Sequence, residues 1–260
     1  MDPDSGTIRS VERAMAILGV LAQNPDGIAP SALAAELDLP VSTCHRLLVT
    51  LEGIGLVHRW ATRGKYSIGY RLHELATQSG SLDAIALTAA RESMERLKEE
   101  LGETCNLARR EGLIARYVYQ VAPTTAFRLF TTVGSAVPLH ATGVGKVLLT
   151  DAPDGVFKSI VRDLKVETPT TIADEASLSE ELARILESGY AIDNEEHQEG
   201  IMCVAVPVHD HTGAIHSALS VAGPSSRISK SLDRIIPTTQ VAGREISGRL
   251  GWQPDLEEAE

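Results

Sequence analysis

The periodicity of apolar residues changes near Gly102, and this change divides the chain into two differently built parts. Before Gly102, apolar residues recur at spacings of three and four, as in amphipathic helices. After it, short runs alternate apolar and polar residues as strands do, with helices between them. A chain of 260 residues can hold two cores. We expect an α+β protein with an N-terminal domain over 1–71, linker helices over 72–102, a C-terminal domain over 103–253 and an acidic tail over 254–260.

Three helices are predicted in the N-terminal domain. The first, "SVERAMAILGVLAQN", is expected to be capped by Ser10 and to bury one face formed by Val11, Met15, Leu18 and Leu21. The second, "PSALAAELDL", has Pro30 near its first position. The third follows Pro40, and its apolar stripe comprises Val41, Cys44, Leu48 and Leu51.

The opposite surface of the third predicted helix carries small hydroxyls and two larger polar groups: Ser42, Thr43, His45 and Arg46. Small side chains in a first turn let the backbone approach a phosphate, and the helix dipole favours an anion there. Arg46, one turn further on, is long enough to reach a guanine or a phosphate. These are the properties of a DNA-recognition helix.

A basic hairpin is predicted directly after this helix. Two β-like runs, Leu56–Trp60 and Tyr66–Ile68, flank the turn "ATRGK", and the cations Arg59, Arg63 and Lys65 gather at its tip. Three helices followed by such a hairpin predict a winged helix-turn-helix that binds double-stranded DNA, with bases read by the helix and phosphates bound by the wing. The alternative is a winged helix that binds only proteins.

The formal net charge of −11 is unevenly distributed. Residues 1–75 carry a net charge of −1, and the remaining residues carry −10. At physiological salt, repulsion between an acidic C-terminal part and DNA is screened beyond about 8 Å. The net charge therefore does not argue against a DNA partner.

The second half of the chain is predicted to be an antiparallel sheet with clustered helices. Strands are expected in "TCNLARREG", "ARYVYQV" and "FRLFTTVG", and two more on either side of the turn "DHTG". The small-residue loop in "PLHATGVGKVLL" leads into a helix, Ser177 with Glu180 suggests a capping box for another, and the last helix covers about 230–250. Such an arrangement is typical of a sensor-like domain.

Several function classes find little support in the sequence. The acidic, polar N-terminus is not a signal peptide, and no apolar run approaches the roughly 20 residues that span a bilayer. Three widely spaced cysteines match neither a disulfide framework nor a zinc motif, so a reducing cytoplasm is the expected setting. We expect no cofactor, and "GVGK" lacks the upstream glycine and the following hydroxyl of a phosphate-binding loop.

Two chemical alternatives stay open at this point. Cys105 or Cys203 would be the nucleophile of an enzyme, with His140 or His197 as its base, although no nucleophile elbow or paired-acid motif accompanies them. The histidines of "HDH" with His216 would suggest a metal site, but a hairpin turn explains them better. We therefore favour neither catalysis nor a metal.

The order of these parts resembles the IclR family of bacterial transcriptional regulators. The resemblance rests on "SVERAMAILGVLA", "STCHRLLVTLEGIGLV", "YSIGYRLHELA", "HATGVGKVLL" and "GYAIDNEEHQEGIMCVAVPVHD", and it covers nearly the whole chain. It implies a winged-helix N-terminal domain and a GAF/PAS-like effector domain. It also implies a dimer or tetramer that binds operator DNA, more often as a repressor, and responds to a small organic effector such as a carboxylate or an aromatic acid.

The resemblance also implies an effector pocket at six positions: Gly143, Val144, Asp193, Ile201, Cys203 and Ser220. Free N–H groups at the start of a helix in "GVG" would cradle a carboxylate, and a thiol and a hydroxyl would add donors. One departure is Ala222, where members that bind small keto-acids have a second serine. This departure favours a larger or more apolar effector.

Plainer interpretations of the pocket residues remain. Cys203 lies in the alternating run "MCVAVPV" and would serve equally as a small core residue. Asp193 would simply cap a turn, and the acids of "DNEEHQE" would form a solvated face.

Overall fold

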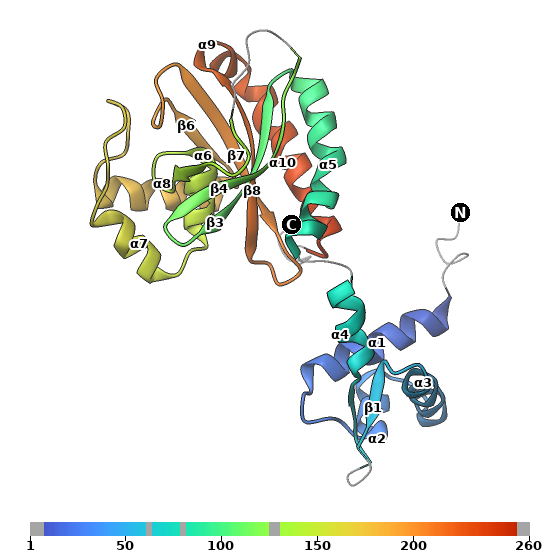
Figure 1. The fold of residues 1–260 in the computed structure, drawn as a ribbon. Helices are drawn as coiled ribbons and strands as arrows, with labels where there is room; N and C mark the ends of the chain where they lie inside the picture. Colours follow the sequence, from blue (N-terminus) through green and yellow to red (C-terminus); the bar gives the residue numbers. More distant parts are fainter. Residues whose placement is uncertain (1–7, 61–63, 79–81, 125–130, 254–260) are drawn as a thin grey trace. The chain divides into compact units, whose positions relative to one another are not determined.

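The computed structural model describes residues 8–60, 64–78, 82–124 and 131–253, and its chain forms two compact units, residues 1–81 and 82–260 (Figure 1). The predicted linker, 72–102, is divided between them. Helix α4 (Tyr70–Gln78) lies in the first unit and α5 (Leu82–Leu101) in the second. Ala90, Met94 and Leu97 of α5 are buried in the core of the second unit, so this helix is part of that unit and not a free spacer.

The first unit contains the predicted three helices and hairpin. Its elements are α1 (Arg9–Gln23), α2 (Pro30–Glu36), α3 (Val41–Gly53), β1 (Val57–Arg59), β2 (Tyr66–Ile68) and α4. β1 and β2 pair antiparallel, with Val57 opposite Ile68 and Arg59 opposite Tyr66. The core is closed by α1, α2, α3 and the hairpin, with Leu21, Leu33, Leu48 and Tyr66 among its most buried side chains.

The predicted buried face of α1 is right for Leu18 and Leu21 and wrong for Val11 and Met15. Val11 and Met15 are 57% and 61% exposed, whereas Ile17, Leu18 and Leu21 are buried. The helix also begins one residue before Ser10, with Ile8 at the N-cap position. Val41 of α3 is likewise 57% exposed, because the stripe that reaches the core starts at Cys44. Both helices carry apolar residues on two faces, and only packing decides which face is buried.

The second unit is built on a six-stranded antiparallel sheet with the order β5-β4-β3-β8-β7-β6. The strands are β3 (Thr104–Glu111), β4 (Ile114–Val121), β5 (Ala136–Pro138), β6 (Ala191–Asn194), β7 (Ile201–His209) and β8 (Ile215–Pro224). Cys203 of β7 lies opposite Asp193 of edge strand β6 and opposite Ala222 of β8.

Helices cover both faces of this sheet (Figure 1). One face packs against α5 and α10 (Leu232–Arg249), and the other against α6 (Gly143–Thr150), α7 (Asp154–Val161) and α8 (Glu175–Ser188). The short helix α9 (Ser225–Ile228) and a 3₁₀ turn (Ser229–Ser231) connect β8 to α10. The α+β fold with an N-terminal helix-turn-helix and a C-terminal antiparallel sheet is confirmed.

Some local predictions for this unit are wrong. Of the strand predicted in "FRLFTTVG", residues 127–130 lie outside the described residues and 131–134 form no strand; β5 follows them at Ala136. Helix α8 is capped by Asp174, whose Oδ1 accepts from the Ser177 N–H at 2.9 Å, and not by Ser177. Edge strand β6 and helix α7 were not predicted, since both are short and lack a long periodic pattern.

None of the helices in the described part of the chain is long and apolar enough to cross a membrane.

Candidate DNA-binding and effector sites

The polar face of α3 is presented to solvent as the sequence predicts. Cys44, Leu48 and Leu51 anchor the helix in the core, while Ser42, His45 and Arg46 are exposed and Thr43 is half-buried. Pro40 occupies the N-cap position and has no side-chain acceptor for the first-turn N–H groups. The first turn of α3 therefore combines small side chains with backbone donors that an anion can use.

The hairpin that follows holds two described cations near its tip. Arg59 is exposed and its guanidinium lies 5.9 Å from the centre of the Tyr66 ring, and Lys65 is half-buried. The Trp60 N–H donates to the Lys65 carbonyl at 2.9 Å, which closes the hairpin next to the turn. Arg63, the third predicted cation, lies outside the described residues.

In the second unit, the start of α6 is set by a cap and a glycine. The Thr142 hydroxyl accepts from the Gly145 N–H at 3.1 Å and donates to the Pro138 carbonyl at 2.8 Å. A Cβ on Gly145 would lie 2.5 Å from the Pro138 carbonyl oxygen, so glycine is required for this approach. A Cβ on Gly143 would lie 3.1 Å from Cys203 Sγ, which shows how closely α6 begins against β7.

A cavity of about 300 Å³ opens between the start of α6, the sheet and the segment after β6. Four of the six predicted pocket residues line it: Val144, Asp193, Ile201 and Cys203. Gly143 and Ser220 are not among the lining residues: Gly143 lies against Cys203, and fully buried Ser220 lies opposite Ala205 and Asn106 in the sheet. Ala222, the departure from the family pattern, is itself a lining residue.

The remaining lining residues are mostly polar and were not predicted. They are Tyr117, Thr131, Thr132, Ser135, Ala136, Val137, Thr142, His197 and Gln198. Hydroxyls predominate, and the described lining contains no lysine or arginine. These residues come from β4, the segment around β5 and the segment after β6, and no local sequence pattern joins segments so far apart.

Asp193 both lines the cavity and caps a turn. Its Oδ1 accepts from the Glu196 N–H at 2.8 Å and from the His197 N–H at 3.4 Å. Burial raises the pKa of the Asp193 carboxyl to about 7, although the Glu196 N–H bond opposes this rise. The carboxyl therefore exchanges its proton near neutral pH.

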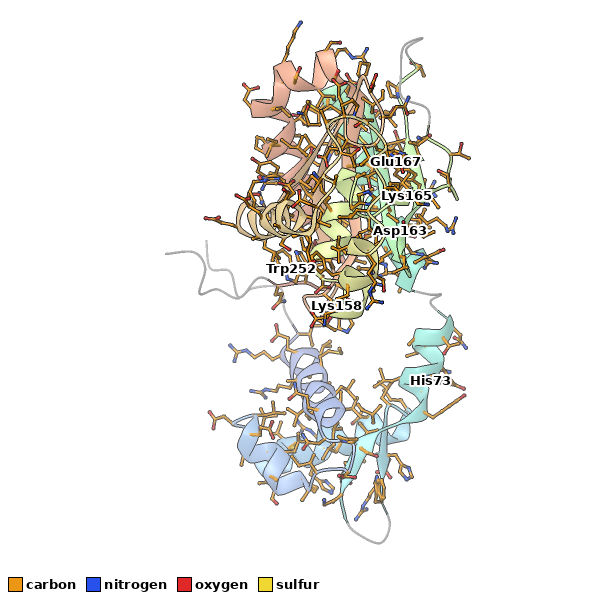
Figure 2. The ribbon with its side chains drawn as sticks, turned by 90° about the vertical axis from the view of Figure 1, so that its left-hand side faces the viewer. His73, Lys158, Asp163, Lys165, Glu167 and Trp252 are labelled. Carbon is orange, nitrogen blue, oxygen red and sulfur yellow. The ribbon has the colours of Figure 1, made fainter. Side chains whose placement is uncertain are left out.

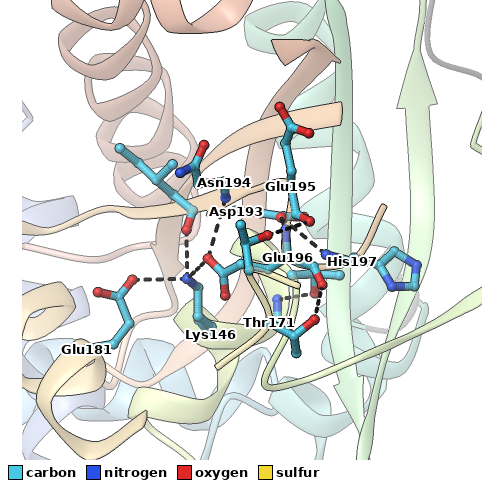
Figure 3. Close-up of polar contacts among 12 residues, drawn as sticks. Lys146, Thr171, Glu181, Asp193, Asn194, Glu195, Glu196 and His197 are labelled. Atoms are coloured by element: carbon cyan, nitrogen blue, oxygen red, sulfur yellow. Dashed lines mark hydrogen bonds and ion pairs between the residues drawn. The ribbon is translucent and has the colours of Figure 1, made fainter. Parts of the chain in front are cut away.

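The solvated-face interpretation of "DNEEHQE" is wrong for Asp193 and Glu196, which are both 5% exposed. Glu196 accepts from buried Lys146 of α6, with 2.5 Å between Nζ and Oε1 (Figure 3). Lys146 also contacts Glu181 of α8 at 3.0 Å and the Ile192 carbonyl at 2.6 Å. Sequence reasoning missed this network because its charged residues are separated by 15 to 50 positions and each resembles a surface residue by type.

The cysteines are poorly suited to nucleophilic chemistry. Burial raises the pKa of the Cys203 thiol to about 12 and also raises that of Cys105, so each thiolate is scarce at neutral pH. Cys105 also lies in the core against α5 and α10, on the sheet face away from Cys203.

One histidine of "HDH", His209, is held by local contacts. His209 Nδ1 lies 2.9 Å from the Gly213 carbonyl, and its ring stacks on Trp252, labelled in Figure 2, with 4.7 Å between ring centres. Among the residues that the structure describes, no group of three or more His, Cys, Asp or Glu side chains is placed to hold a metal ion.

Comparisons with known proteins agree with both units. Residues 81–248 match the family described as bacterial transcriptional regulator IclR C-terminal, and residues 10–59 match the IclR helix-turn-helix domain. The HTH-type transcriptional repressor AllR of Escherichia coli (strain UTI89 / UPEC) is 34% identical over 254 residues, covering 95% of this chain and 92% of that protein. The HTH-type transcriptional regulator BhcR of Paracoccus denitrificans (strain Pd 1222) is 33% identical over 261 residues, covering 98% and 92%.

Solved structures show the same fold. The repressor BlcR of Agobacterium tumefaciens superposes with a TM-score of 0.70 at 24% identity, covering 96% of this chain and 100% of that one. An IclR homologue from Microbacterium hydrocarbonoxydans in complex with 4-hydroxybenzoate superposes with a TM-score of 0.61 at 24% identity, covering 93% and 98%.

Proposed function

The chain belongs to the IclR family of bacterial transcriptional regulators, and from this premise we propose that it is a repressor whose affinity for operator DNA changes when a small organic acid binds its C-terminal unit. The observation that carries the proposal is the pairing of a helix-turn-helix with a separate unit that contains a cavity of about 300 Å³. In this proposal the protein binds operator DNA and an effector, and it catalyses no reaction.

For DNA, the proposal assigns base contacts to α3 and phosphate contacts to the wing. Exposed Ser42, His45 and Arg46 and half-buried Thr43 form the polar side of α3, and an α-helix of this kind fits the major groove. Arg59, Lys65 and, from the sequence, Arg63 are the wing cations. The packing of α3 supports this division, because one side of the helix is anchored in the core and the first turn on the other side is exposed to solvent.

For the effector, the proposal assigns the carboxylate to the start of α6. The N–H groups near Gly143 and Val144 and the dipole of α6 favour an anion there. Hydroxyls of the lining would hold a second polar group, and Ile201, Val144 and Ala222 would contact an apolar body. The 4-hydroxybenzoate bound by the Microbacterium relative supports an acid of aromatic size.

We also propose that two copies associate through the first unit. Exposed apolar side chains lie on α1 and α4 and just before α1, namely Ile8, Val11, Met15, Tyr70 and Leu75, and each is at least 44% exposed. A second copy would bury them and present two α3 helices to a pseudo-palindromic operator. This proposal explains why α1 is apolar on two faces.

Arg46→Ala is expected to weaken binding to the operator by about 1–3 kcal/mol and to reduce the preference for operator over random DNA. Lys65→Ala is expected to weaken both complexes alike, because phosphate contacts carry no sequence information. The measurement is fluorescence polarisation of labelled operator and random duplexes over a range of salt concentrations.

Lys158→Ala is the matched control for these variants. It removes the same charge from an exposed position on α7 in the second unit and should leave both affinities unchanged. Equal losses on operator and random DNA for Arg46→Ala would contradict its assignment to base recognition.

A further inference from the structure

The turn after β6 forms one wall of the effector cavity and is fastened from several sides. Asp193, near the end of β6, and His197, in the turn, both line the cavity. Glu195, its first residue, has a left-handed backbone with φ of 63°, which a non-glycine residue adopts at a cost. Thr168 donates to the Glu195 carbonyl at 2.7 Å, and Thr171 donates to the Glu196 carbonyl at 2.6 Å. The turn is therefore held in one conformation by outside contacts.

Lys146 ties this turn to the helix that forms another wall. Its side chain is 1% exposed, and its ammonium bonds to Glu196 Oε1 in the turn and to the Ile192 carbonyl in β6 (Figure 3). Val144, two residues earlier on α6, lines the cavity. One buried cation therefore fixes the spacing between the start of α6 and the turn.

Neither Lys146 nor Glu196 lines the effector cavity. Lys146 and Glu196 line a separate depression of about 530 Å³ together with Glu181 and Arg184. Glu196 nevertheless reaches the cavity through its backbone, because its N–H donates to Asp193 Oδ1 at 2.8 Å. This hydrogen bond links the ion pair to Asp193 without any contact between the pair and the cavity.

We propose that Lys146 and Glu196 are positioning residues of the effector cavity: their buried ion pair holds Asp193 and His197 at the distance from the start of α6 that effector binding requires. This inference rests on the proposed function of the cavity and adds two residues that touch no effector. A purely structural pair would contribute to stability and leave the effector affinity unchanged.

The first test needs no effector. In the full chain with ¹³C-labelled aspartate carboxyls, the Asp193 resonance is assigned by its loss in Asp193→Asn, and its titration midpoint is measured in each variant. Asp193 interacts, through charge or a hydrogen bond, with the titratable residues Glu196, Lys146, His197, Cys203 and Tyr117. Lys146→Met and Glu196→Gln remove opposite charges.

The midpoint should rise in Lys146→Met and fall in Glu196→Gln, each on the order of half a pH unit or more. Glu181→Gln is the matched control, since Glu181 contacts Lys146 but has no contact with the turn among the described hydrogen bonds. In this variant the titration midpoint of Asp193 should equal that of wild type. Unchanged midpoints in both Lys146→Met and Glu196→Gln would overturn the inference.

The second test measures effector affinity at preserved stability. Removing one partner of a buried ion pair destabilises a protein more than replacing both partners by apolar residues. The double variant Lys146→Met/Glu196→Leu is therefore compared with wild type and with Glu181→Gln. Pyruvate and 4-hydroxybenzoate are the probes, titrated by calorimetry into the full chain. The double variant should keep its operator affinity and its melting temperature and bind the acid at least tenfold more weakly, whereas Glu181→Gln should bind it as wild type does.

Wild-type affinity in the folded double variant would overturn the inference while leaving the proposed function intact. Failure of wild type itself to bind either acid would count against the proposed function, and the carboxyl titration would then decide the inference alone.

Discussion

Replacing Gly145 by alanine is expected to destabilise the C-terminal unit by about 3 kcal/mol, although alanine is the better helix former. The added Cβ would lie 2.5 Å from the Pro138 carbonyl oxygen and 2.6 Å from Leu139 Cα. These are backbone atoms that cannot rotate away, so α6 must move or the chain before it must shift. Urea denaturation of the full chain followed by circular dichroism measures the effect.

Gly155→Ala is the matched control for this prediction. Gly155 lies in the first turn of α7, and a Cβ added there would have no neighbouring atom within 4 Å among the described residues. Alanine there should stabilise the protein by about 0.5–1 kcal/mol through helix propensity and reduced freedom of the unfolded chain. A Gly145→Ala protein as stable as Gly155→Ala would show that the close approach of α6 is not required.

The second large effect concerns Asp193 and pH. Its pKa is about 7 in the folded protein, against roughly 3.9 for an unfolded aspartate, so the folded state holds a proton that the unfolded state has released. Stability from this group is therefore lost as the pH rises from about 4 to about 7. Above pH 7 the penalty approaches about 4 kcal/mol.

Asp193→Asn removes this titration and should be more stable than wild type at pH 8, with the difference disappearing near pH 4. The measurement is the free energy of unfolding of both proteins across this range, so that contributions from other groups cancel. Asp163→Asn, at an exposed position labelled in Figure 2, should show no such pH-dependent difference. A constant difference between Asp193→Asn and wild type would contradict the raised pKa.

The same proton affects the proposed effector binding. An ionised Asp193 repels an acid in a cavity whose described lining holds no lysine or arginine, whereas a protonated Asp193 can donate to it. The proposal therefore couples acid binding to proton uptake by Asp193.

The sequence predicts the elements of the first unit because its signals are local. The spacing of Cys44, Leu48 and Leu51 orients α3, and the turn before Lys65 defines the hairpin. The buried face of α1 was predicted only in part, because exposed Val11 and Met15 follow the same helical spacing as buried Leu18 and Leu21. Periodicity alone cannot distinguish a face that packs in the monomer from one left exposed.

The effector cavity was only partly predictable. Val144, Asp193, Ile201 and Cys203 came from the family resemblance, and all four line it. Tyr117 and Thr131 could not be found, because only the folded second unit brings them beside residues about 60 to 105 positions away. Lys146 and Glu196 were missed because a charged residue is expected on the surface, and only the tertiary structure shows that the two are buried against each other.

The most direct measurement of the central claim is binding of the full chain to the DNA upstream of its own gene, with and without pyruvate and 4-hydroxybenzoate. The account predicts a salt-sensitive complex that is preferred over random DNA and whose dissociation constant changes about 5- to 150-fold when one of the acids is added. No preference for that fragment at low ionic strength, with or without either acid, would contradict it.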